Sequence, residues 1–247
     1  MLEFIGVFDL REGIKMYWYY GDSTYILFMI ISLAVTLYAQ IKVKNAFNKY
    51  SKIRSSNGLT GAEAAKKVLE HNNVSGISVN RTSGYFADYY DARTKGVYLS
   101  ENVYSEPTLA AVSVAAHECG HATQDDVGYW PIRLRQILVP VTTASSRLAM
   151  PLVLIGLFLP TKYQFVINLG IILYSVAVLF ELVTLPVEFD ASGRALKALK
   201  EGGMLAPEEI KGARKVLSAA AMTYLAAAFT SLLSLIRLIL IARSRRD

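Results

Sequence analysis

Long apolar runs alternate with polar stretches along the 247-residue chain. The first run, from Tyr25 to Ile41, has about the length that a helix needs to cross ~30 Å of hydrocarbon. Two more runs, roughly Leu148 to Leu159 with part of the preceding segment and Phe165 to Leu185, flank the short connection 160–164 and predict a hairpin. The last run covers Ala219 to Ile241. The pattern predicts a mainly α-helical membrane protein with about four transmembrane helices.

The stretch from Lys42 to about Gln136 has a lower apolar density and is patterned like a globular domain. The elements that it predicts are a helix over 60–71 that begins with a capping box at Thr60 and Glu63, short β-like runs at 77–79 and 96–99, and a helix from Ser105 and Pro107 to His121. We therefore expect a small α+β domain with a short sheet.

These patterns divide the chain into five expected segments. They are an N-terminal segment with the first transmembrane helix (1–41), a cytoplasmic domain (42–136), a transmembrane hairpin (137–185), a polar helical segment (186–215), and a C-terminal transmembrane helix with a basic tail (216–247). The N-terminal segment lacks the basic start and the cleavage site of a signal peptide, and its aromatic cluster at 17–20 suits a membrane interface.

Basic residues indicate the orientation of these segments in a cell membrane. Lysines and arginines gather at 42–54 and 194–215, whereas the hairpin connection contains only Lys162. Because basic loops are retained in the cytoplasm, we expect a multi-pass protein whose polar domain faces the cytoplasm. The tail with Arg243, Arg245 and Arg246 would then lie outside, against this bias, so either the last run is re-entrant or the tail is tolerated.

Composition excludes several other classes of protein. Hydrophobic residues make up 53% of the chain, which is untypical of an ordinary soluble fold. The single cysteine, Cys119, cannot form an intrachain disulfide. The net charge of +6 comes from residues beside apolar runs, without interleaved aromatic residues, so we expect the lipid bilayer rather than nucleic acid as a partner.

The segment His117-Glu118-Cys119-Gly120-His121 carries the strongest chemical signal. His117 and His121 are four residues apart on a predicted helix, so both imidazoles project from one face and can bind one Zn²⁺ ion. Glu118 lies beside them and can take a proton from an attacking water molecule. Only three histidines occur in the chain, and two of them occupy this motif.

A catalytic zinc ion usually has three protein ligands, and no further histidine follows at the compact spacing of metzincins. Glu188 is the best candidate, because Pro186 can start a helix and Glu188 would fall in its first turn. Glu181 is the second choice. Asp190 should point about opposite to Glu188, which suggests an outer-shell role or an ion pair with Arg194.

Four blocks of sequence resemble the YugP-type membrane zinc peptidases. They are GYFADYYD at 84–91, VYLSENVY at 97–104, VAAHECGHATQ at 114–124 and LPVEFDAS at 185–192, and the resemblance runs from about Leu59 to Leu196. It implies a gluzincin related to the HtpX and Ste24 peptidases, with a zincin-like domain. It also implies that Glu188 completes the zinc site, and that the strand with Val97, Tyr98 and Leu99 is an edge that pairs with substrate.

The chain departs from this family pattern at one place. It has Asp88-Tyr89-Tyr90-Asp91-Ala92 where Asp-His-Tyr-Asp-Pro is expected. The role of that histidine is therefore open, and the Tyr89 hydroxyl could instead donate to a developing oxyanion. Cys119 is about 200° around the helix from His117, so it should face the core.

The sequence thus predicts a membrane-bound zinc peptidase with one Zn²⁺ per chain. His117, His121 and Glu188 would hold the metal, and Glu118 would act as general base in hydrolysis of peptide or membrane-protein substrates by an endopeptidase. Two alternatives remain: an intramembrane site-2-type protease, which needs its motif inside a spanning helix, and a zinc-stabilised scaffold, which needs no base. The oligomeric state is left open.

Overall fold

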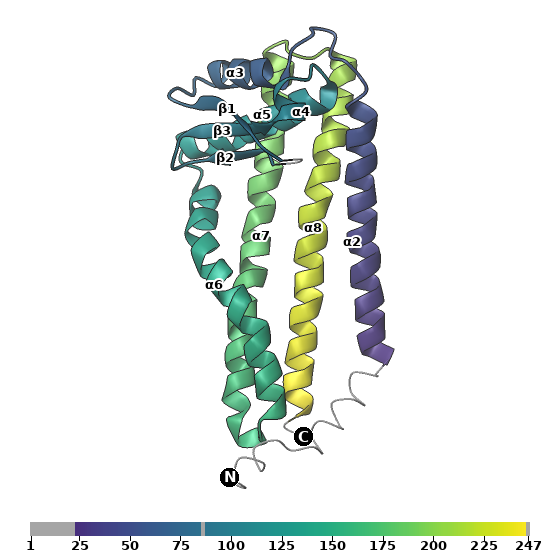
Figure 1. Ribbon diagram of the computed structural model, residues 1–247, viewed down its shortest axis with the longest axis vertical. Helices are drawn as coiled ribbons and strands as arrows, with labels where there is room; N and C mark the ends of the chain where they lie inside the picture. Colours follow the sequence, from purple (N-terminus) through teal and green to yellow (C-terminus); the bar gives the residue numbers. More distant parts are fainter. Residues whose placement is uncertain (1–22, 85–86, 246–247) are drawn as a thin grey trace. The chain divides into compact units, whose positions relative to one another are not determined.

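The computed structural model describes residues 23–84 and 87–245 (Figure 1). The aromatic cluster at 17–20, expected at the membrane interface, lies outside the described residues. The chain divides into two compact units. The first, called the membrane unit, comprises Met1–Leu37, Arg135–Val183 and Ala226–Asp247. The second, called the motif unit because it contains His117 and His121, comprises Tyr38–Leu134 and Thr184–Leu225.

Within the described residues, four helices are long and apolar enough to cross a membrane, as the sequence predicts. They are α2 (Ser23–Tyr50), α6 (Trp130–Phe158), α7 (Gln164–Glu201) and α8 (Pro207–Ser244). Each contributes residues to both units. The 38 residues of α8 form one continuous helix of about 57 Å, so the last apolar run is not re-entrant.

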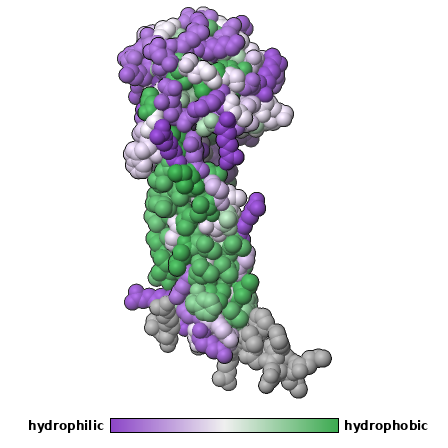
Figure 2. All heavy atoms as spheres, turned by 90° about the vertical axis from the view of Figure 1, so that its left-hand side faces the viewer, coloured by the Kyte–Doolittle hydropathy of each residue, from purple (hydrophilic) through white to green (hydrophobic). Residues whose placement is uncertain are grey.

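The helices of the membrane unit present large apolar side chains on their outer faces. Leu33, Ile137, Phe165 and Ile172 are each more than half exposed, and Figure 2 shows such side chains as a green surface over these helices. In water this exposure would be unfavourable, since each such side chain forfeits about 1.5–3 kcal/mol of burial free energy. The surface is suited to lipid, in agreement with a membrane protein.

The α6–α7 hairpin is closed by capping interactions with the end of α8. Gln164 donates to the carbonyl oxygen of Ala242 at 3.1 Å. In return, the Arg245 guanidinium donates to the carbonyl oxygens of Gly156 and Leu159, at the C-terminal end of α6. Arg245 therefore binds the carbonyl oxygens of a helix end, where a cation is favourable. This contact gives one basic residue of the tail a structural role at the hairpin.

The motif unit combines short helices with a small sheet. Its elements are α3 (Gly61–His71), β1 (Ser78–Thr82), β2 (Tyr89–Asp91), β3 (Gly96–Ser100), α4 (Glu101–Tyr104) and α5 (Leu109–Asp126). The predicted capping box of α3 is present, with Thr60 and Glu63 bonded reciprocally. The last helix, α5, begins at Leu109 after the cap Thr108, four residues later than the sequence suggested.

In the described part of the sheet the strand order is β1-β3-β2, and β3 pairs in parallel with β1 and antiparallel with β2. The prediction that Val97, Tyr98 and Leu99 form a substrate edge is therefore wrong, because β3 is the middle strand and both of its sides are already hydrogen-bonded. Val97 and Leu99 are fully buried. The edges belong to β1 and β2, and the three residues of β2 were too short a run to detect.

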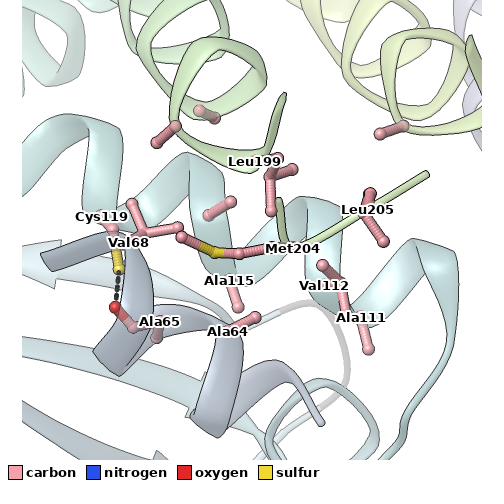
Figure 3. Close-up of a cluster of buried hydrophobic side chains, with 14 of the residues drawn as sticks. Ala64, Ala65, Val68, Ala111, Val112, Ala115, Cys119, Leu199, Met204 and Leu205 are labelled. Carbon is pink, nitrogen blue, oxygen red and sulfur yellow. Dashed lines mark hydrogen bonds between the residues drawn. The ribbon is translucent and has the colours of Figure 1, made fainter. Parts of the chain in front are cut away.

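The core of the motif unit lies between α3, α5 and the end of α7. Figure 3 shows Ala64, Ala65 and Val68 of α3 facing Ala115 and Cys119 of α5. Leu199, Met204 and Leu205 close the cluster from the α7–α8 side. The many alanines allow these helix backbones to approach closely, and they explain how the apolar lead-in to the motif is buried.

One predicted boundary in α7 is wrong. Pro186 does not start a helix: α7 runs without interruption from Gln164 to Glu201, so Glu188 lies in its interior rather than in a first turn. A proline inside a helix removes one backbone hydrogen bond. The helix nevertheless continues through Pro186, next to the buried residues Thr184, Val187 and Glu188. The segment expected at 186–215 is thus the end of α7, a short turn and the start of α8.

Candidate metal centre

Two helices bring three potential metal ligands together. His117 and His121 project from one face of α5, with ring centroids 4.7 Å apart and nearly perpendicular planes. Glu188 of α7 faces them, and its Oε2 atom lies 3.2 Å from Nε2 of His117 and 3.6 Å from Nε2 of His121. The ligand atoms of the three residues lie within 4.8 Å of one another. The group joins parts of the chain that are 71 residues apart.

Gly120 allows α7 to come this close to α5. A methyl group at Gly120 would lie 2.4 Å from the carbonyl oxygen of Ala191, a backbone atom that cannot move aside. Any larger residue at position 120 would therefore push α7 away. Since Ala191 is only three residues after Glu188, such a shift would carry the carboxylate away from the imidazoles.

The three side chains are shielded from solvent to different degrees. The Glu188 side chain is 2% exposed and that of His121 is 8% exposed, whereas His117 reaches 15%. A carboxylate buried beside two imidazoles needs a compensating positive charge. Two imidazole nitrogens and one carboxylate oxygen are also the donor set that catalytic zinc sites of the His₂Glu type use. The residues present therefore fit a zinc ion.

Each histidine has a hydrogen-bond partner on its second ring nitrogen. Ser192 Oγ lies 3.2 Å from Nδ1 of His117, and Gln124 Oε1 lies 3.0 Å from Nδ1 of His121. Such partners orient imidazole ligands. Sequence reasoning missed both residues, although the spacings offered a signal: Gln124 follows His121 by three residues and Ser192 follows Glu188 by four, so each lies on the face of its ligand.

Asp190 and Arg194 form the ion pair that their spacing suggested, with Arg194 Nε donating to Asp190 Oδ2 at 2.6 Å. Asp190 does not point wholly away from the centre, however. The same Oδ2 atom accepts from Nε2 of Gln124 at 2.8 Å. The expectation that Asp190 lies opposite Glu188 took only α7 into account. The long Gln124 side chain of α5 reaches Asp190 and connects it to His121.

The remaining motif residues lie on different sides of α5. Glu118 is largely buried, at 8% exposure, and does not belong to the three-ligand group. Cys119 faces the core, as its helical position predicts, and its thiol donates to the carbonyl oxygen of Ala65 at 3.4 Å. Burial, followed by the nearby charge of Glu118, raises the pKa of the Cys119 thiol. The thiol is therefore held protonated and away from the ligands.

The β2–β3 turn is braced against the end of α5. Asp125 Oδ2 accepts from the Tyr90 hydroxyl at 2.8 Å and from the Lys95 ammonium at 2.7 Å. Burial, followed by the bond to Asp125, raises the pKa of Tyr90, so this hydroxyl remains a donor. Asp125 follows His121 by one helical turn. The bracing thus ties the sheet to the helix that carries both histidines.

Two other candidates are not brought to the ligand group. Glu181 belongs to the membrane unit, whereas Glu188 belongs to the motif unit. Tyr89 is 45% exposed, and its ring stacks on Tyr98 at a centroid distance of 4.9 Å. An oxyanion role for Tyr89 therefore stays a prediction.

Comparison with known proteins agrees with this geometry. Residues 25–243 match the family described as "Putative neutral zinc metallopeptidase". A relative from Bacillus subtilis (strain 168), "Putative membrane protease YugP", is 44% identical over 223 residues, which cover 90% of this chain and 98% of the relative. No solved structure matches the chain. The chain, with two histidines and a glutamate that converge from α5 and α7, belongs to this family of membrane zinc metallopeptidases.

Proposed function

We propose that the chain is a membrane-bound endopeptidase that holds one Zn²⁺ ion on His117, His121 and Glu188 and uses Glu118 as general base. The observation that carries this proposal is the convergence of three ligand atoms within 4.8 Å, two of them on buried residues, with a buried glutamate that is not a ligand directly after His117 in the sequence. A purely structural zinc site has four protein ligands and needs no adjacent base.

The chemistry follows from these positions. When bound, zinc supplies Lewis acidity, which polarises the scissile carbonyl and lowers the pKa of water. Glu118 takes one proton from the attacking water as the water oxygen bonds to the carbonyl carbon. Glu118 then delivers that proton to the amide nitrogen as the C–N bond breaks, so a carboxylic acid and an amine leave. No covalent bond to the protein forms.

An extended substrate would bind beside the edge strand β2, and not beside β3 as the sequence suggested. Edge strands offer unpaired backbone groups to a peptide. Of the two edge strands, β2 is the one that the Tyr90–Asp125 hydrogen bond ties to α5. This mode of binding selects unfolded segments over folded domains, and unfolded peptides or membrane proteins are the proposed substrates.

The motif unit is proposed to face the cytoplasm. Its basic residues at 42–54 and 194–215 support this orientation, while Lys162 is in the hairpin connection. In a Cys119→Ala background, Lys66→Cys, at an exposed position of α3, should react with an impermeant maleimide only when the cytoplasmic face is accessible. Lys162→Cys should react only from the other face. The reverse pattern would overturn the orientation.

The alternatives fit less well. A site-2-type protease needs its motif inside a spanning helix, but α5 is not one of the four described helices that could cross a membrane. A zinc-stabilised scaffold would have no use for a buried glutamate beside the ligands.

Removal and return of zinc test the proposal. Purified protein should contain about one zinc and cleave internally quenched peptides that are blocked at both ends, which only an endopeptidase can use. A chelator should abolish cleavage, and stoichiometric zinc should restore it. Full zinc content without cleavage across a broad library of blocked peptides and unfolded proteins would favour the scaffold.

A further inference from the structure

Gln124 is a fully buried amide whose side-chain atoms all have partners. Its Oε1 atom lies 3.0 Å from Nδ1 of His121. Its Nε2 atom donates to the carbonyl oxygen of Val187 and to Oδ2 of Asp190, each at 2.8 Å. Exposure of Gln124 is 0%. The side chain therefore connects a ligand on α5 to the stretch of α7 on either side of Glu188.

Its partners fix the orientation of this amide. A backbone carbonyl can only accept a hydrogen bond. The Asp190 carboxylate, which is paired with Arg194, is likewise an acceptor only. Rotating the amide by 180° would place its oxygen against both acceptors and leave buried groups without donors, at a high cost in free energy. The NH₂ group must face α7, and the amide oxygen must face His121.

This orientation determines the tautomer of His121. The amide oxygen can only accept, so the Nδ1 atom of His121 must carry the proton. A neutral imidazole has a single N–H, and Nε2 therefore keeps its lone pair. Nε2 is also the atom directed at Glu188, 3.6 Å from its Oε2.

We propose that Gln124 is a positioning residue. It holds His121, before metal binds, in the tautomer that has its proton on Nδ1 and its lone pair on Nε2, the atom that would bind the metal. That His121 binds a metal rests on the proposed function, whereas the hydrogen bonds that set its tautomer do not. One short chain of hydrogen bonds from Arg194 through Asp190 and Gln124 to His121 makes the lone pair of Nε2 available, and it fastens α7 at the residue directly before Glu188.

His117 provides an internal comparison. Its Nδ1 partner is the hydroxyl of Ser192, at 3.2 Å. A hydroxyl can donate or accept, so it accommodates either tautomer of His117. The two histidines are therefore controlled differently: Gln124 dictates a tautomer, and Ser192 does not.

The direct test is ¹⁵N NMR of the full-length protein in detergent with ¹⁵N-labelled histidine. Only three histidines contribute signals, and substitutions of His71 and His117 assign them. In metal-free protein at a pH where the imidazoles are neutral, His121 should show a protonated Nδ1 and an unprotonated Nε2. A wild-type spectrum with Nε2 protonated would overturn the proposal, and this result needs no variant.

Two substitutions separate tautomer control from attachment of α7. Gln124→Glu keeps an acceptor for His121 but loses both donors to α7, so the Nδ1–H form should persist. Gln124→Met loses both functions, so His121 should become a mixture of tautomers, and zinc affinity should fall by ~10–100-fold. Ser192→Ala, the matched control, should weaken zinc binding by less than ~10-fold.

Circular dichroism and thermal unfolding of the metal-free variants control for folding. Unchanged His121 signals and unchanged zinc affinity in folded Gln124→Met would contradict the proposal. The outcome is distinct from failure of the proposed function: wild-type protein that binds no zinc would remove the enzyme assignment, while the metal-free spectrum still decides the tautomer.

Discussion

Each half of α7 makes a close helix–helix contact at a glycine, and the two contacts lie in different surroundings. In the membrane unit, a methyl group at Gly170 of α7 would lie 2.9 Å from the carbonyl oxygen of Ala149 on α6. In the motif unit, a methyl group at Gly120 of α5 would lie 2.4 Å from the carbonyl oxygen of Ala191 on α7. A glycine thus lets two helix backbones approach closely in each unit.

The surroundings of the two contacts differ. Near Gly170, the buried neighbours are apolar, with Val153 and Ile167 in the same cluster. Such close packing is what holds helices together in lipid, where burial from water provides no driving force between them. Near Gly120, by contrast, the contact is flanked by the bonds of His117 and Gln124 to α7. The first contact serves stability, and the second serves to place a carboxylate.

The largest effect should come from Glu188, and Glu181 of the same helix is its matched control. Glu188→Ala removes a ligand and should lower zinc affinity by more than the ~100-fold typical of losing an outer-shell partner. Glu181→Ala, in the membrane unit, should leave zinc binding unchanged. Competition with a chromogenic chelator measures both. Equal zinc affinities in the Glu188→Ala variant and the wild type would show that α7 does not supply the third ligand.

Substitution at the close contact should have the next largest effect. Gly120→Ala forces α5 and α7 apart, so it should destabilise the protein by ~1–3 kcal/mol and weaken zinc binding. Gly193→Ala is the matched control, because a methyl group there meets nothing within 4 Å. Alanine is favoured over glycine in a helix by ~0.5–1 kcal/mol, so this variant should be unchanged or slightly more stable.

Thermal unfolding and zinc titration of these two variants, side by side, give the result. If Gly120→Ala bound zinc as tightly as Gly193→Ala, the close approach of the helices would not be needed for the centre.

The smallest effect on zinc affinity is expected from substitution of Gly170, the close contact in the membrane unit. Gly170→Ala should loosen the α6–α7 hairpin and lower the thermal unfolding midpoint, since Val153 and the Ala149 carbonyl would have to shift. Zinc affinity should change by less than ~2-fold, as for distant sites that share no partners. A large loss of zinc affinity in this variant would mean that packing in the membrane unit is coupled to the centre.

The sequence predicted the features that depend on local spacing. The apolar runs gave the four long helices, the Thr60–Glu63 spacing gave the capping box, and the four-residue spacing of His117 and His121 placed both on one face. Glu188 was singled out because a third ligand was required, although Pro186 was wrongly taken as the start of its helix.

Features that depend on packing between distant segments were missed. The polar run at 89–91 is too short for a strand signal, and it becomes β2 only because β3 offers it a partner. Gln124 and Ser192 are ordinary polar residues until α5 and α7 meet. Gly120 likewise reads as a weak helix position, and only the approach of Ala191 explains why a side chain is not tolerated there.

The most direct test of the account compares purified wild-type protein with its Glu118→Gln variant, with zinc content and cleavage of blocked peptides measured on the same samples. Glutamine preserves the shape of the side chain but cannot take the proton from water. The account predicts that both proteins bind about one zinc ion and that only the wild type cleaves, with the loss in the variant at least the ~10²–10⁴-fold typical of a missing general base. Cleavage by the variant at the wild-type rate, with zinc retained, would contradict it.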